Sequence, residues 1–126
     1  MPLDELRKYI LRKPDIIYEI DAHKMEDLVR SVFKDFFPSC KVKSFGKTRD
    51  GGKDGLLIDE NGKQFLIQIK RRTHAMSTEG VEGLRELIGV KVLEDDVNGC
   101  IFVTTADHFS NPAQKYAQEV IKKSVV

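Results

Sequence analysis

Two apolar segments joined across Asn61-Gly62 constrain the fold of this chain more than any other feature of its sequence. The segments read DGLLID at residues 54–59 and KQFLIQIKRR at residues 63–72. An Asn-Gly pair between apolar runs is a strong signal for a β-hairpin, because both residues tolerate the backbone conformations of a tight turn. The chain is therefore expected to contain a sheet built around this hairpin.

The length of the hairpin loop determines which side chains share a face of the sheet. A two-residue loop would turn Asp54 away from Gln68. A three-residue loop over 60–62, closed by Gly62 in the left-handed conformation, pairs residue 59 with residue 63 and places Asp54 opposite Gln68. Lys70 then lies one step along the same face. Glycine at the third loop position favours this second register.

The rest of the chain alternates between helical and extended patterns. Helices are expected over residues 3–13, from an N-cap at Asp21 to Pro38, from a cap at Ser77 to about Leu93, and from a cap at Ser110. The core positions of the second and last of these are expected to be Met25, Leu28, Val29, Val32, Phe33 and Phe36, and Ala113, Tyr116, Ala117, Val120 and Ile121.

Further strands are expected at CKVKSF, residues 40–45, and at GCIFVTT, residues 99–105, the latter apolar throughout as in buried strands. GKTRDGGKDG, residues 46–55, has the composition of a flexible loop. This order predicts an α/β fold with a central mixed sheet flanked by helices on both faces. The 126 residues are expected to form a single domain, 1–126, in which residues 1–20 are a helical extension.

Charge is distributed unevenly along the chain. Between Lys41 and Arg72 there are nine basic residues and four acidic ones, a balance of +5 in a chain whose formal net charge is +1. This basic segment indicates an anionic partner, and nucleic acid is the commonest large one. On charge alone, solvated lysines on an edge strand explain the segment equally well.

Composition also bears on location. The sequence contains no transmembrane stretch, and its first residues are too charged for a secretory signal. Cys40 and Cys100 lack the spacing of a metal motif and are expected to be buried thiols in a reducing environment. These features predict a cytoplasmic protein without a membrane partner.

Asp54, Gln68 and Lys70 can be read as a metal site. A carboxylate and an amide oxygen are hard ligands suited to Mg²⁺, and a neighbouring lysine can position a water or neutralise charge on a phosphoryl group. The alternative is a structural acid in a turn, a strand-end amide and a solvated lysine. The three residue types alone favour that alternative.

Five segments, in this order, resemble the catalytic domain of Mrr-type restriction endonucleases, a branch of the PD-(D/E)xK nuclease superfamily with a restriction-endonuclease-like fold. They are MEDLVRSVF, GGKDGLLI, FLIQIKRR, GLRELIGV and CIFVTTADHFS, and the resemblance extends over roughly residues 20–120. The family's Gly-x-Asp-Gly is matched by Gly52–Gly55, its Gln-x-Lys by Gln68–Lys70, and its helix glutamate by Glu26. Met25 replaces the usual aromatic residue, and Lys53 replaces the superfamily's proline.

The resemblance implies a role for each matched residue. Asp54 would be the central metal ligand, with Gln68 and the Ile69 carbonyl as further oxygen ligands, and Lys70 would position or activate the attacking water. Glu26 would complete the catalytic set from the edge of its helix, reaching the metal through a water; without the family, an acid in a first helical turn is ordinarily just favourable to the helix dipole.

The function expected from these residues is hydrolysis of DNA phosphodiester bonds by a Mg²⁺-dependent endonuclease, with Mn²⁺ able to substitute. The resemblance suggests a role in prokaryotic defence (restriction) or DNA processing. The alternatives are a junction resolvase or repair nuclease, and a non-catalytic DNA-binding module on the same fold. A homodimer and a separate target-recognition domain or subunit are further partners left open. The expected DNA-binding residues are Lys47, Arg49, Lys53, Arg71 and Arg72.

Overall fold

The computed structural model describes residues 2–44, 54–94 and 96–123. The helices of the described chain are α1 (Leu3–Arg12), the short 3-10 helix η1 (Pro14–Tyr18), α2 (Ala22–Phe36), α3 (Val81–Leu93) and α4 (Asn111–Lys123). The strands are β1 (Lys41–Ser44), β2 (Gly55–Ile58), β3 (Gln64–Lys70), β4 (Thr78–Glu79), β5 (Val97–Thr104) and β6 (His108–Phe109). Most of the predicted loop 46–55, including Lys47, Arg49 and Lys53, lies outside the described residues.

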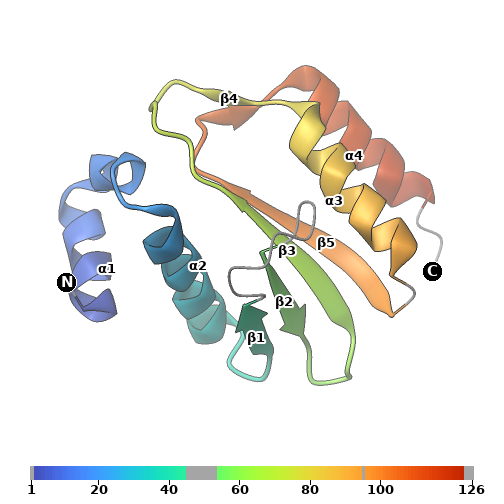
Figure 1. The fold of residues 1–126 in the computed structure, drawn as a ribbon, viewed down its shortest axis with the longest axis horizontal. Helices are drawn as coiled ribbons and strands as arrows, with labels where there is room; N and C mark the ends of the chain where they lie inside the picture. Colours follow the sequence, from blue (N-terminus) through green and yellow to red (C-terminus); the bar gives the residue numbers. More distant parts are fainter. Residues whose placement is uncertain (1, 45–53, 95, 124–126) are drawn as a thin grey trace.

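The central sheet has the strand order β1-β2-β3-β5. Strands β1, β2 and β3 pair antiparallel, whereas β5 runs parallel to β3. Helices α1 and α2 lie beside one face of this sheet, and α3 and α4 lie beside the other (Figure 1). The prediction of an α/β fold with a mixed sheet between helices is therefore confirmed.

The α2 helix begins where the sequence predicts. The side chain of Asp21 accepts a hydrogen bond from the Lys24 amide at 2.8 Å, which satisfies one of the unpaired N–H groups of the first turn. Met25, Leu28 and Val29 are buried against α1 and against Ile69 and Val103 of the sheet. One position was predicted wrongly: Phe36 is 73% exposed, because it lies in the last turn, beyond the covering sheet.

The opposite face of the sheet packs on α3. Leu66 of β3 is fully buried, and it forms a cluster with Leu87 and Val97. Strand β5 differs from the prediction of a fully buried strand. It is the last strand of the sheet, and most of its residues are only half-buried, because it has a neighbouring strand on one side alone within the described chain.

The hairpin has the predicted register. Leu56 pairs with Leu66 and Ile58 with Gln64, so the three-residue loop is confirmed. Gly62 has a φ of 82°, and its amide donates to the Asp59 carbonyl at 3.0 Å. The Asp59 side chain also accepts from the backbone amides of Asn61 and Lys63, each at 2.9 Å, which holds the turn closed.

The start of α3 was predicted wrongly. Its N-cap is Gly80, and the hydroxyl of Ser77 donates instead to the His74 carbonyl at 2.8 Å. The residues between them form β4, which pairs parallel with β6 in a separate two-stranded sheet. Because these strands are two residues long and far apart in sequence, no local pattern predicts them.

The last helix is capped as predicted. The Ala113 amide donates to the Ser110 hydroxyl at 3.1 Å, and Ala113 is buried. Ile121 was predicted to face the core but is 72% exposed. Cys40 and Cys100 are free thiols, and both are half-buried rather than fully buried. Within the described residues, none of the helices has the length and apolar character needed to cross a membrane.

Substituting Gly62 is expected to destabilise the protein without disturbing its core. Among the described residues other than its chain neighbours, no atom lies within 4 Å of the position that a Cβ would occupy, so the cost is the left-handed backbone alone. Gly62→Ala should lower the free energy of unfolding by about 1 kcal/mol, and Gly62→Asn by less. Urea denaturation followed by circular dichroism measures both values. Equal stability of all three proteins would contradict the proposed role of this conformation.

Candidate active site

Asp54 directly precedes β2, next to the point where the backbone pairing of β2 with β3 ends. Its amide donates to the Ile67 carbonyl at 2.7 Å. Its carboxylate oxygen Oδ2 accepts from the backbone amide of Ile69 and from Nε2 of Gln68, each at 2.8 Å. The carboxylate therefore takes the place of a strand partner at the edge of β3, and two donors fix its position.

Gly55 is required beside this carboxylate. A Cβ at this position would lie 2.9 Å from the Lys43 carbonyl oxygen, which is closer than real Cβ contacts. A side chain here would push β1 and β2 apart. Glycine thus allows the strand pairing that brings Asp54 to Gln68.

Gln68 is an amide buried in the centre of the fold, at 4% exposure. Its Nε2 donates to Asp54 and lies 3.5 Å from the Ile69 carbonyl oxygen. Its Oε1 is buried, and no hydrogen-bond partner is found for it among the described residues. A buried amide oxygen without a partner is costly, so this oxygen is a candidate ligand.

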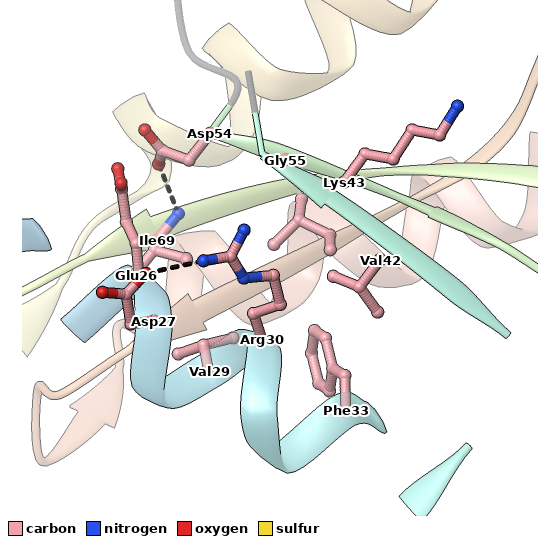
Figure 2. A pocket seen from close by; sticks show the side chains of 11 residues that line it. Glu26, Asp27, Val29, Arg30, Phe33, Val42, Lys43, Asp54, Gly55 and Ile69 are labelled. Carbon is pink, nitrogen blue, oxygen red and sulfur yellow. Dashed lines mark hydrogen bonds and ion pairs between the residues drawn. The ribbon is translucent and has the colours of Figure 1, made fainter. Parts of the chain in front are cut away.

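Glu26 lies in the second turn of α2, which begins at Ala22, and not in the first turn as the sequence suggested. Its side chain is 23% exposed, and it lies 4.0 Å from Nδ1 of His23. Glu26, Asp54 and Ile69 line one pocket between α2 and the sheet (Figure 2). The figure shows the Glu26 and Asp54 side chains extending from different elements toward this pocket. The structure therefore brings the helix acid and the hairpin acid to the same place.

Lys70 ends β3, and strand alternation places its side chain on the same face as Gln68. Its backbone partner on β5 is Thr104. The positive charge of Lys70 is among the influences on the buried carboxyl of Glu79, so these two groups are electrostatic neighbours. Asp54, Gln68 and Lys70 thus lie along one side of the hairpin, as the three-residue loop predicts.

Arg71 and Arg72, both expected to contact DNA, have different surroundings. Nε of Arg71 is buried, and no hydrogen-bond partner is found for it among the described residues. Arg72 donates from Nε and Nη2 to the two carboxylate oxygens of Glu79, at 2.9 and 2.5 Å. Arg72 is therefore held in one orientation by an acid that the sequence reasoning did not identify.

Glu79 is the buried charge of this region, at 1% exposure. Its burial disfavours ionisation, but hydrogen bonds from Arg72 and Thr104 and the charges of Arg72 and Lys70 outweigh this effect. The pKa of Glu79 is consequently held below its usual value. In the sequence Glu79 is an acid close to a helix start, which ordinarily indicates a solvated side chain; no nearby motif distinguishes it.

The residues around Asp54 fit a hard divalent cation. The available donors are the carboxylates of Asp54 and Glu26, the Ile69 carbonyl and Oε1 of Gln68, for which the described residues offer no hydrogen-bond partner. All are oxygens, as Mg²⁺ and Mn²⁺ prefer. No group of three or more His, Cys, Asp or Glu side chains placed to bind a metal occurs in the described parts of the chain.

The mixed sheet between helices, with an acid, an amide and a lysine along one hairpin, agrees with the restriction-endonuclease-like fold expected from the sequence. The family model Mrr_cat, described as a restriction endonuclease, matches residues 17–126, and the chain belongs to this family. Neither the curated proteins nor the solved structures contain a match to the chain. DNA is therefore the substrate class that the family implies.

Proposed function

We propose that the protein is a divalent-metal-dependent DNA endonuclease that uses Mg²⁺, with Mn²⁺ as a substitute. The observation that carries this proposal is the position of the Gln68 side chain, whose Nε2 donates to Asp54 at 2.8 Å and lies 3.5 Å from the Ile69 carbonyl oxygen. This set lies beside the pocket that Glu26 also lines. A purely structural hairpin does not require a buried amide oxygen that has no partner in the described part of the chain.

The chain's own residues divide the chemical work. Asp54, Gln68, Glu26 and the Ile69 carbonyl hold the cation, which when bound stabilises negative charge on the phosphoryl oxygens. Lys70 orients or activates the attacking water and balances charge near the cleaved phosphate. The hydrogen bonds from β3 to Asp54 keep the carboxylate in position before substrate binds.

DNA binding is attributed to basic residues that are close in sequence to Asp54 and Lys70. Arg71 and Arg72 follow the catalytic strand directly, and Lys47, Arg49 and Lys53 precede Asp54 in the sequence. Such contacts to phosphates supply affinity but little sequence information. We therefore propose weak sequence preference. One active site cuts one strand, so double-strand breaks would require a homodimer or two successive nicks.

The proposed role in the cell is restriction, defence or DNA processing, in the cytoplasm. A junction resolvase or repair nuclease could be built on the same residues. The candidate from another class is a DNA-binding module that does not cleave. The retention of Asp54, Gln68 and Lys70 in one register favours catalysis over this alternative.

Incubation of the purified protein with supercoiled plasmid tests the proposal. Nicked or linear products are expected with Mg²⁺ and with Mn²⁺, because both ions accept an all-oxygen site. No product is expected with EDTA, and readdition of Mg²⁺ should restore cleavage. Plasmid binding without cleavage at any tested concentration of either ion would instead favour the non-catalytic module.

A further inference from the structure

The buried carboxylate of Glu79 organises the region just beyond the catalytic strand. Its Oε1 accepts from Nε of Arg72 and from the hydroxyl of Thr104, the latter at 2.6 Å, while its Oε2 accepts from Nη2 of Arg72. Its backbone is also fixed, because the Ser110 amide donates to the Glu79 carbonyl at 2.8 Å. Glu79 is therefore a charged side chain with fixed contacts to the residue that follows Lys70 and Arg71 and to the end of β5.

Arg72 is fixed at its backbone as well as at its side chain. The Arg72 amide donates to Oγ1 of Thr105 at 2.6 Å, and the same hydroxyl donates to the Arg72 carbonyl at 2.9 Å. The side chain of Arg72 nevertheless remains 44% exposed. Arg72 is thus partly exposed to solvent, yet hydrogen bonds fix both its backbone and its guanidinium.

The geometry of the pair leaves one edge of the guanidinium available. A guanidinium is planar and carries five N–H donors. When Nε and Nη2 face a carboxylate, the edge formed by Nη1 and the second N–H of Nη2 points away from it. This second edge matches two oxygens of a phosphate.

Local charge also favours an anion at this edge. Glu79 carries one negative charge, whereas Arg72 and Lys70 are basic residues whose charges both favour the ionised form of Glu79. The formal charges of Glu79, Arg72 and Lys70 sum to +1, so these three residues, here called the Glu79 cluster, favour a bound anion. Arg72 lies two residues after Lys70, so a phosphate bound there would be close to the one proposed for cleavage.

We propose that Glu79 is a positioning residue, which orients Arg72 so that its outer edge binds a DNA backbone phosphate next to the cleaved one. This inference rests on the proposed function as a DNA nuclease. It assigns Arg72 a fixed phosphate contact rather than a general contribution to the basic surface. It also gives the buried acid a role in substrate binding that acts only through Arg72.

The test measures duplex binding by the full chain at several NaCl concentrations in EDTA, and nicking in Mg²⁺. Arg72→Gln should weaken binding roughly threefold to tenfold and reduce the slope of log K against log salt by about 0.9, as expected for one lost phosphate contact. Glu79→Gln leaves the arginine charge in place. It should weaken binding by a smaller factor than Arg72→Gln and raise KM at nearly constant kcat, with the salt slope unchanged because the arginine still neutralises phosphate charge.

Two further variants test whether Glu79 affects DNA binding only through Arg72. In Arg72→Gln, the added Glu79→Gln change should weaken binding no further, because Glu79 acts only through Arg72. Lys63→Gln removes a positive charge at the opposite, exposed end of β3 and should affect binding less than Arg72→Gln. Circular dichroism and Tm confirm that each variant is folded at the assay temperature.

Tighter binding by Glu79→Gln would overturn the inference, since Glu79 would then compete with phosphate for Arg72. An unchanged salt slope in Arg72→Gln would also overturn it. If Glu79→Gln does not fold, Arg72→Lys decides: lysine keeps the charge without the two-edged geometry, so binding equal to the parent's contradicts the proposal. If the unsubstituted protein binds DNA but does not nick it, only the proposed nuclease activity is contradicted. If it binds no DNA, both proposals are contradicted.

Discussion

Asp54→Ala and Lys70→Ala are each expected to reduce plasmid nicking by at least about a thousandfold while leaving duplex binding largely intact. Affinity for DNA comes from many phosphate contacts, whereas the chemical step depends on a few groups. Asp54 is fixed by two hydrogen bonds at the edge of β3, and no other described carboxylate occupies this place. Nicking rates in Mg²⁺ and binding constants in EDTA measure the two effects separately.

The same hairpin supplies matched controls for this experiment. Glu60 and Lys63 are an exposed acid and an exposed lysine at the turn, at the far end of the strands from Asp54. Glu60→Ala and Lys63→Ala should retain nicking close to the parent's rate. If Asp54→Ala and Lys70→Ala lost binding and cleavage to the same extent, the assignment of these residues to the chemical step would be wrong.

Gln68→Leu is expected to raise the Mg²⁺ concentration needed for half-maximal nicking by at least about tenfold, because leucine removes the amide oxygen proposed as a ligand. Gln68→Glu should have the opposite effect. A further carboxylate next to Asp54 and Glu26 strengthens metal binding, so less Mg²⁺ should be needed and activity should be retained. A Mg²⁺ titration of the nicking rate compares both variants with the parent protein.

Gln64→Leu is the matched control. Gln64 begins the same strand, four residues before Gln68, and strand alternation places both side chains on the same face. It should titrate with Mg²⁺ like the parent. A Gln68→Leu protein that also titrates like the parent would show that the amide is not a ligand. The structural interpretation of this strand would then be preferred.

The alignment of Asp54 with Gln68 could be predicted because it depends on local turn chemistry. A glycine at the third loop position requires one backbone conformation, and strand alternation then fixes every facing pair. The α2 and α4 helices were predictable for similar reasons, since Asp21 and Ser110 cap them through contacts within a single turn. Each of these features depends on residues that are close together in the sequence.

The features that sequence reasoning missed depend on distant contacts. Strand β4 exists because β6 lies beside it, and Ser77 loses its expected capping role as a result. Glu79 becomes a buried ion-pair partner only after β4 is placed over Arg72 and Thr104. Periodicity also cannot show where the sheet ends, which is why Phe36 was assigned to the core and residues 99–105 were expected to form a fully buried strand.

The hairpin and the Glu79 cluster differ in how far along the chain their contacts reach, and this difference bears on folding kinetics. Asp54 and Gln68 are 14 positions apart, whereas Arg72 and Thr105 are 33 positions apart. Hairpins close in roughly 1–10 μs, and pairings between distant strands form more slowly because a longer loop must first be closed. The proposed metal ligands on the hairpin can therefore align before β5 joins the sheet. The restraint on Arg72 also needs Thr105, so it is complete only after the end of β5 has reached β3.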